Sequence, residues 1–142
     1  MKINDITSII IEESIYIHKK LGPGLFEYVY EEVLAYRLAK HGLRVDRQVG
    51  IPVIFEEVKM NVGFRADLII ENKVLVEIKS QEVLPKVAEM QVLTYLRLTE
   101  MQIGLLINFN VEKLIDGLKR IANNYKEDQL HAERAEEQRP QG

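Results

Sequence analysis

Two acidic residues and a lysine are the side chains best suited to do chemistry in this 142-residue sequence. Asp67 lies in the run GFRADLII, and Glu77 and Lys79 lie in the run KVLVEIKS that follows it. Both runs are rich in apolar and β-branched residues and therefore predict β-strands. Because strand side chains alternate between faces, Glu77 and Lys79 share one face. Carboxylate oxygens are the ligands that Mg²⁺ and Mn²⁺ prefer, so these residues predict a divalent-metal site.

The loop between the two runs decides which side chains face each other. If residues 71–73 form the loop of a hairpin, Ile70 pairs with Val74. Counting back from that pair places Asp67 opposite Glu77. Like charges at such opposed positions, with Cβ atoms roughly 4.5 to 5.5 Å apart, are destabilising unless a positive charge lies between them. A divalent cation would supply that charge, whereas a shift of one residue in the pairing would move Asp67 to the other face.

Apolar neighbours argue that these charges are buried. The alternative interpretation is that Asp67, Glu77 and Lys79 form the solvated face of a half-exposed hairpin. However, Ile69 and Leu75 share the charged face, and the opposite face carries further apolar side chains, namely Leu68, Ile70, Val74, Val76 and Ile78. Strands with apolar residues on both faces are typical of a covered sheet. A buried carboxylate needs a partner, so the pattern favours a functional site.

Several motifs together resemble a known family. The arrangement of Asp67, a hairpin and then Glu77-Ile78-Lys79 resembles the D…(D/E)xK signature of the PD-(D/E)XK nuclease superfamily. Residues 24–30, GLFEYVY, fit G-x-x-E-x-x-Y, and blocks spread over residues 5–124 resemble the small GxxExxY family. The resemblance implies an α/β fold with a restriction-endonuclease-like core, a mixed β-sheet flanked by α-helices. It also implies hydrolysis of phosphodiester bonds in DNA or RNA with Mg²⁺ or Mn²⁺.

The resemblance also implies roles for individual residues. The metal would be held by Asp67, Glu77 and the main-chain carbonyl of Ile78, while Lys79 would orient or deprotonate the attacking water. A helix before the sheet often adds an acidic ligand in this superfamily, and Glu27 occupies that position. Glu27 is equally explained as a first-turn glutamate favoured by the helix dipole, and Glu31, one turn later, is the substitute.

Further candidates come from the third predicted helix and the first strong strand. Gln91 and Tyr95 are spaced i and i+4, share a helix face, and resemble the QxxxY element of RecB-type nucleases. They are equally explained as ordinary residues of an amphipathic helix. Arg65 lies on the same strand face as Asp67 and is predicted to bind a substrate phosphate or to pair with an acid. His18, at the end of the first predicted helix, is interpreted as structural.

The elements that must position these residues alternate between helix and strand. Apolar spacing, caps and glycine or proline stops predict helices at 6–21, 26–40, 86–99 and 112–125, and strands at 45–55, 58–61, 63–70, 73–80 and 103–108. One domain over residues 1–125 is expected, because the chain is too short for two ordinary domains. Residues 126–142 are highly charged and nearly free of apolar side chains, which predicts a disordered tail or frayed helix.

Composition excludes several classes of protein. The absence of cysteine excludes disulfides, thiolate metal sites and cysteine nucleophiles, and makes a reducing cytoplasm the expected location. No apolar stretch is long enough to span a membrane. The net charge of −3 weighs against tight, non-specific binding of nucleic acid. It therefore leaves open a second hypothesis, a nuclease-fold module that binds or regulates without cutting, including as a homodimer.

Overall fold

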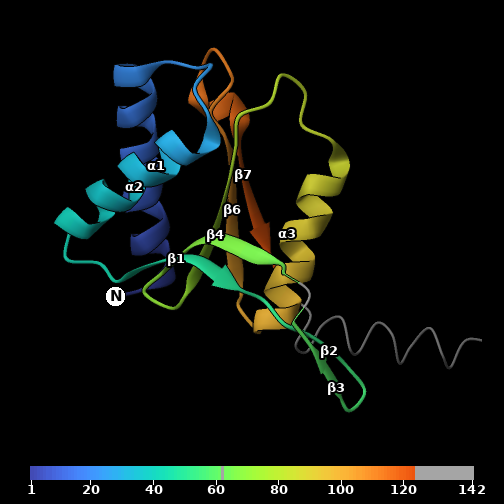
Figure 1. Ribbon diagram of the computed structural model, residues 1–142. Coiled ribbons are helices and arrows are strands. Elements are labelled where there is room, and N and C mark those ends of the chain that lie inside the picture. The colour runs from blue at the N-terminus through green and yellow to red at the C-terminus, as the bar shows by residue number, and fades with distance from the viewer. Residues whose placement is uncertain (62, 124–142) are drawn as a thin grey trace, which may run out of the picture.

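A computed structural model of the protein describes residues 1–61 and 63–123 (Figure 1). Along the chain the elements are α1 (Ile3–Leu21), α2 (Glu27–Lys40), β1 (Val45–Gly50), β2 (Val53–Phe55), β3 (Val58–Met60), β4 (Arg65–Ile70), β5 (Val74–Lys79), α3 (Lys86–Thr99), β6 (Ile103–Asn108), the 3₁₀ helix η1 (Leu114–Gly117) and β7 (Leu118–Ala122). The tail expected at residues 126–142 lies outside the described residues. In the described part of the chain, no helix is long and apolar enough to cross a membrane.

A five-stranded mixed sheet forms the centre of the molecule. Its strand order is β1-β4-β5-β6-β7, and a separate two-stranded sheet contains β2 and β3. The strands β5 and β6 run parallel, while the other neighbours in the large sheet run antiparallel. Parallel neighbours require a crossover connection, and α3 provides it. Helices α1 and α2 cover one face of the sheet and α3 covers the other (Figure 1). The expected α/β fold with helices flanking a mixed sheet is confirmed.

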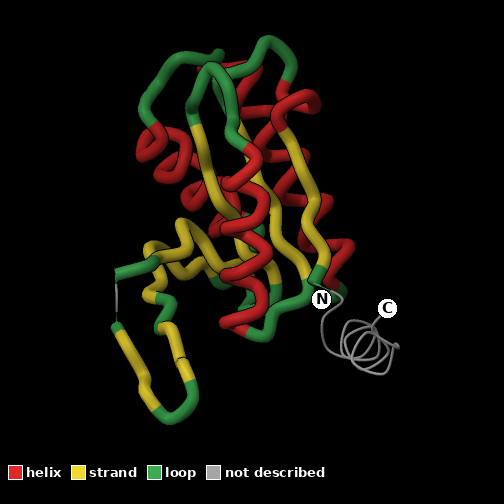
Figure 2. The backbone as a smooth tube through the Cα atoms, turned by 90° about the vertical axis from the view of Figure 1, so that its right-hand side faces the viewer, coloured by secondary structure: helices red, strands yellow, loops and turns green. Residues whose placement is uncertain are grey.

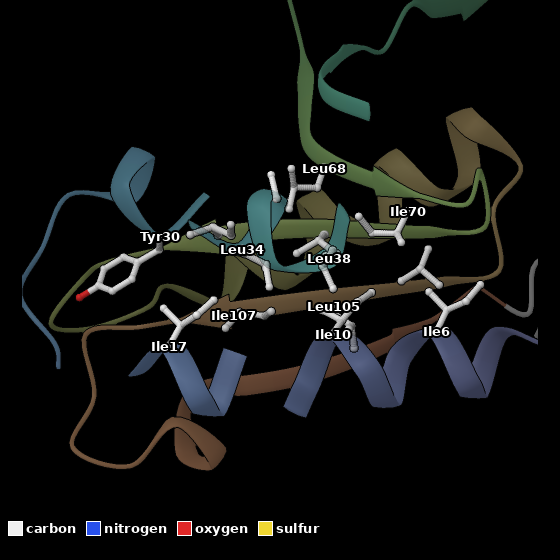
Figure 3. Packing of buried hydrophobic residues seen from close by; sticks show 14 of the residues in the cluster. Ile6, Ile10, Ile17, Tyr30, Leu34, Leu38, Leu68, Ile70, Leu105 and Ile107 are labelled. Carbon is white, nitrogen blue, oxygen red and sulfur yellow. The ribbon is translucent and has the colours of Figure 1, made fainter. Parts of the chain in front are cut away.

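Each face of the sheet has its own hydrophobic core. Figure 3 shows the core beneath α1 and α2, where Ile6, Ile10 and Ile17 of α1 point toward the sheet. The apolar residues expected on one face of the β4–β5 hairpin, namely Leu68, Ile70, Val74, Val76 and Ile78, all belong to this core. Ile69 and Leu75 belong to the second core, beneath α3. Both faces of the hairpin are therefore covered, as the sequence predicted.

The β4–β5 hairpin has the predicted register. Ile70 pairs with Val74, and Leu68 pairs with Val76. The loop is closed by a hydrogen bond from the Lys73 amide to the Ile70 carbonyl, at 2.9 Å. Glu71 and Asn72 adopt positive φ angles of 53° in this loop. This tight connection places the chemically interesting residues of the two strands side by side.

The predicted helix at 112–125 is wrong. Residues Leu114–Gly117 form a single 3₁₀ turn, and Leu118–Ala122 form β7, which pairs antiparallel with β6. Without β7 the backbone of β6 would be an unpaired edge between two cores, so tertiary pairing overrides the local helical periodicity. Gly117 permits the close approach, because a Cβ at this position would lie 2.2 Å from the backbone oxygen of Asn108.

The predicted strand at 45–55 is divided in two. β1 ends at Gly50, and β2 begins at Val53, with Pro52 between them. Proline has no amide hydrogen to donate to a sheet, so it marks the break. The short hairpin of β2 and β3 extends away from the main body (Figure 2).

Candidate functional site

The strands β4 and β5 separate where Asp67 and Glu77 lie. Their pairing runs from Ile70 and Val74 as far as Leu68 and Val76. Beyond that point β4 remains paired with β1 as far as Arg65, while β5 remains paired with β6 as far as Lys79. The sheet therefore opens into a gap between β4 and β5, which we call the fork, and the two carboxylates lie at its base.

Asp67 and Glu77 bind each other's strand at the base of the fork. The amide of Asp67 donates to Oε1 of Glu77, at 3.1 Å, and the amide of Ile78 donates to Oδ2 of Asp67, at 2.7 Å. The bond from the Ile78 amide takes the place that a ladder hydrogen bond would occupy in a continuous pair of strands. The two carboxylates are therefore held close together, in agreement with the hairpin register that the sequence predicted.

Burial of this carboxylate pair makes its negative charge costly. Glu77 is only 4% exposed. Its burial, and to a lesser extent the charge of Asp67, raises its pKa from 4.5 to about 8. Burial also raises the pKa of Asp67, against the lowering effect of the hydrogen bond from Ile78. Without a nearby cation, Glu77 therefore keeps its proton at neutral pH. A buried acid pair of this kind is typical of functional sites.

Lys79 and Glu27 act on this pair through their charges. Lys79 is half-buried at the end of β5, and its charge lowers the pKa of both Asp67 and Glu77. Glu27 is the first residue of α2 and is exposed, and its charge is the smallest of the causes that raise the pKa of Glu77. Lys79 and Glu27 therefore both lie within electrostatic reach of the pair.

Glu31 is buried, with 7% of its surface exposed, and is engaged by two residues of β1. Nη2 of Arg47 donates to Oε2 of Glu31, at 2.9 Å, and Nε2 of Gln48 donates to its Oε1, at 2.5 Å. The charge of Glu31 also raises the pKa of Asp67. Glu31 is thus linked to the fork through β1 and shares the Arg47 guanidinium with Glu32, whereas Glu27 is free of such an ion pair among the described residues.

Gln48 is a site residue that the sequence reasoning missed. Its Nε2 donates to Oδ1 of Asp67, at 3.2 Å, as well as to Glu31, so a single amide bridges the two acids. Its φ angle is 50°, in the left-handed region that non-glycine residues rarely adopt. Backbone strain of this kind is concentrated at functional positions. The available sequence signal was the polar run DRQ within a predicted strand.

The remaining predicted residues differ in burial and contacts. Tyr95 of α3 is buried, and burial, followed by the charges of Glu77 and Asp67, raises its pKa. Gln91 lies one turn earlier on α3 and is exposed. Arg65 is exposed, and its Nη1 donates to the backbone oxygen of Gln48, at 3.2 Å.

His18 lies away from this group, at the end of α1. Its Nε2 forms a 2.8 Å hydrogen bond with the Val111 carbonyl, and its ring lies 6.5 Å from that of Phe109. These contacts connect α1 to the loop after β6. They account for His18 without any ligand.

The donors at the fork fit a magnesium-type ion. In residues 1–61 and 63–123, no three Asp, Glu, His or Cys side chains converge on one point. The available donors are the carboxylates of Asp67 and Glu77 and the Ile78 carbonyl, which points into the fork because a strand residue directs its N–H and C=O to the same side. Mg²⁺ is usually bound by one or two carboxylates and completes its shell with water. A cation would also offset the repulsion within the buried pair.

Comparison with known proteins identifies the family. The family model described as the PD-(D/E)XK nuclease superfamily matches residues 4–121. No curated protein matches the chain. Among solved structures, a chain titled "Crystal structure of SSO0001" is 17% identical, with 94% of this chain and 87% of that chain covered and a TM-score of 0.45. The fold is thus a restriction-endonuclease-like core. On the match over residues 4–121, the chain belongs to the PD-(D/E)XK nuclease superfamily.

Proposed function

We propose that the protein is a nuclease that uses Mg²⁺ or Mn²⁺ to hydrolyse phosphodiester bonds of DNA or RNA. The observation that carries this proposal is the pairing of buried Glu77 with half-buried Asp67 at the fork, where the charge of Lys79 acts on both. Members of the superfamily generally use divalent metals. A buried and a half-buried carboxylate, whose ionisation is opposed by burial and by mutual repulsion, are costly to keep without such chemistry.

Each residue has a definite role in this proposal. Asp67, Glu77 and the Ile78 carbonyl hold the cation, and Glu27 is a further ligand at the start of α2. The cation, when bound, supplies the positive charge that activates water and stabilises the scissile phosphate. Nζ of Lys79 orients the attacking water or accepts its proton.

Three other side chains complete the proposed site. Tyr95 and Gln91 order the active site or the substrate from the α3 side. The Arg65 guanidinium, exposed on β4, binds a substrate phosphate. These three residues surround the reacting groups without supplying the metal ligands.

We also propose that the chain belongs to the GxxExxY group within the superfamily, because the motif residues have clear physical roles. Gly24 has a φ angle of 92°, which glycine adopts without strain. The Tyr30 hydroxyl donates to the Gly22 carbonyl, at 2.6 Å, and accepts from the Leu25 amide, at 3.2 Å. Tyr30 thus shapes the loop that brings Glu27 toward the fork.

A cleavage assay tests the proposal. Purified protein is incubated with labelled single- and double-stranded DNA and RNA, with Mg²⁺, with Mn²⁺ or with EDTA. We expect metal-dependent cleavage that is lost in Glu77→Ala and Lys79→Ala and is retained in Glu82→Ala, a control at an exposed residue. Cleavage that survives both Glu77→Ala and Lys79→Ala would come from a contaminant and would remove the proposal.

Metal titration separates this proposal from the second hypothesis. By calorimetry, we expect Mn²⁺ binding to the wild type and loss of that binding in Asp67→Asn. A protein that binds nucleic acid, whether as a monomer or a homodimer, but shows no binding of Mn²⁺ or Mg²⁺ dependent on Asp67, would instead be a module that does not cut.

A further inference from the structure

Two aromatic side chains are strongly exposed at the start of α2. Phe26 is 75% exposed and Tyr28 is 68% exposed. Their rings are nearly parallel, with an interplanar angle of 14° and centroids 6.0 Å apart. Aromatic side chains are normally among the most buried, so such exposure of a ring pair is not explained by folding.

The aromatic pair borders a groove that reaches the proposed active site. Besides the pair, the groove is lined by Gly24, Leu25, Glu27, Ser80 and Asn110. Ser80 directly follows Lys79 on the chain, and Glu27 is the acid whose charge acts on Glu77. The loop between α1 and α2 and the loop after β5 lie at the same end of the molecule (Figure 1). A ligand on the aromatic pair would therefore extend along the groove toward Lys79.

The loop that carries the pair is held in place before any ligand binds. Oγ of Ser80 donates to the Leu25 carbonyl at 2.6 Å, which ties the loop to the end of β5. The Tyr30 hydroxyl bonds to both Gly22 and Leu25, and its ring stacks on Phe109 with centroids 4.3 Å apart. A surface that is already ordered loses little entropy when it binds.

The charge of the protein indicates what kind of contact the pair makes with nucleic acid. The net charge of −3 weighs against strong affinity built on many phosphate contacts. Proteins that bind single strands stack bases on exposed aromatic rings, because every base has a π-face. The last turn of α1 also carries exposed Lys19 and Lys20, close in sequence to the aromatic loop and suited to contact the flanking phosphates.

From these observations we propose that Phe26 and Tyr28 form a stacking platform for unpaired nucleobases. The substrate is accordingly a single strand, or the unpaired end of a duplex, that lies along the groove toward Lys79. The inference rests on the proposed nuclease function and adds the class of nucleic acid to it. In a paired duplex the bases stack on one another, so they cannot occupy the platform without first being separated.

Binding without cleavage tests the platform. Fluorescence anisotropy is measured in EDTA, in the Glu77→Gln background, with a labelled single-stranded DNA, an RNA of the same sequence, an abasic strand of the same length, and a blunt duplex. We expect Phe26→Ala and Tyr28→Ala each to weaken binding of both single strands, by roughly 5- to 150-fold. We expect the abasic strand and the duplex to bind more weakly than the single strands and to be insensitive to these changes.

Matched controls separate loss of the rings from general damage. Phe26→Tyr and Tyr28→Phe keep a ring at each position and should retain binding. Tyr36→Ala removes a different exposed tyrosine of α2, 60% exposed, and should also retain binding. Circular dichroism and thermal melting of each variant verify that the fold is intact.

Different results overturn the platform and the nuclease function. The platform would be overturned if the protein that keeps both rings bound the abasic and normal strands equally. Unchanged binding after both alanine substitutions would also overturn it, even if cleavage is metal-dependent. Dissociation of a dimer on Phe26→Ala, without a change in strand binding, would also overturn it, since the rings would then cover a second copy. Ring-dependent strand binding in a protein that never cleaves would refute the nuclease function alone.

Discussion

Replacement of Glu77 by glutamine should make the metal-free protein increasingly more stable than the wild type as the pH rises. Glutamine has nearly the same shape and its side-chain oxygen can still accept the hydrogen bond from the Asp67 amide, but it carries no charge. In the wild type, the pKa of Glu77 is about 8 in the folded state, against its ordinary value of 4.5, which applies to the unfolded chain. Between these values the folded protein binds a proton that the unfolded chain has released. Stability therefore falls as the pH rises through this window.

The size of the effect follows from the same two pKa values. Each unit of pKa shift corresponds to about 1.4 kcal/mol. Between about pH 5 and about pH 8, the wild type should lose roughly 3 to 4 kcal/mol of unfolding free energy relative to Glu77→Gln. The unfolding free energy of a typical domain is only about 5 to 15 kcal/mol, so the change is easily measured.

Urea unfolding in EDTA at a series of pH values, followed by circular dichroism, measures this difference. Glu82→Gln, at an exposed carboxylate, is the matched control and should follow the wild type. Addition of Mg²⁺ should flatten the pH dependence of the wild type, because the cation stabilises the ionised pair in the folded state alone. Parallel curves for wild type and Glu77→Gln would refute the reasoning, since the buried carboxyl would then ionise without cost.

Two further predictions concern glycine packing and the bridging amide. Gly117→Ala should destabilise the protein more than Gly104→Ala, because the new Cβ would lie 2.2 Å from the backbone oxygen of Asn108 at Gly117 but 2.9 Å from a side-chain methyl at Gly104. Urea unfolding should show a loss of about 1 to 3 kcal/mol of unfolding free energy for Gly104→Ala. The reverse order of the two variants would contradict the packing argument. Gln48→Glu should lower the metal-free melting temperature and enlarge the stabilisation by Mg²⁺, since it adds a carboxylate beside Asp67; an unchanged Mg²⁺ shift would contradict this bridging role.

The parts of the site that sequence predicted are those set by local pattern. A two-residue period with a three-residue loop determines that Asp67 and Glu77 lie opposite each other, and apolar residues on both faces indicate burial. Chain order then places Lys79 on the same face as Glu77. None of these inferences requires knowledge of distant contacts, which is why the β4–β5 hairpin and its register were confirmed.

The parts that sequence missed depend on distant contacts. The segment 112–125 has helical spacing, but Leu118–Ala122 forms a strand because it pairs with the otherwise open edge of β6. Likewise, Gln48 reaches Asp67 only because β1 lies beside β4 and because the Gln48 backbone takes a left-handed conformation. Strand pairing between segments far apart in sequence, and a strained backbone angle, leave little trace in residue type.

The way in which the fork is held open suggests how loss of activity would be recorded in related structures. Asp67 occupies the Ile78 amide, a backbone donor that would otherwise join β5 to β4. If a descendant exchanged both acids for aliphatic residues, this donor would need a new acceptor, and a carbonyl of the opposing strand would be the nearest. The pairing of β4 with β5 would then continue beyond Leu68 and Val76. Continuous pairing of β4 with β5 at this point, visible in the backbone alone, would identify a relative that lacks the acidic site but keeps the fold.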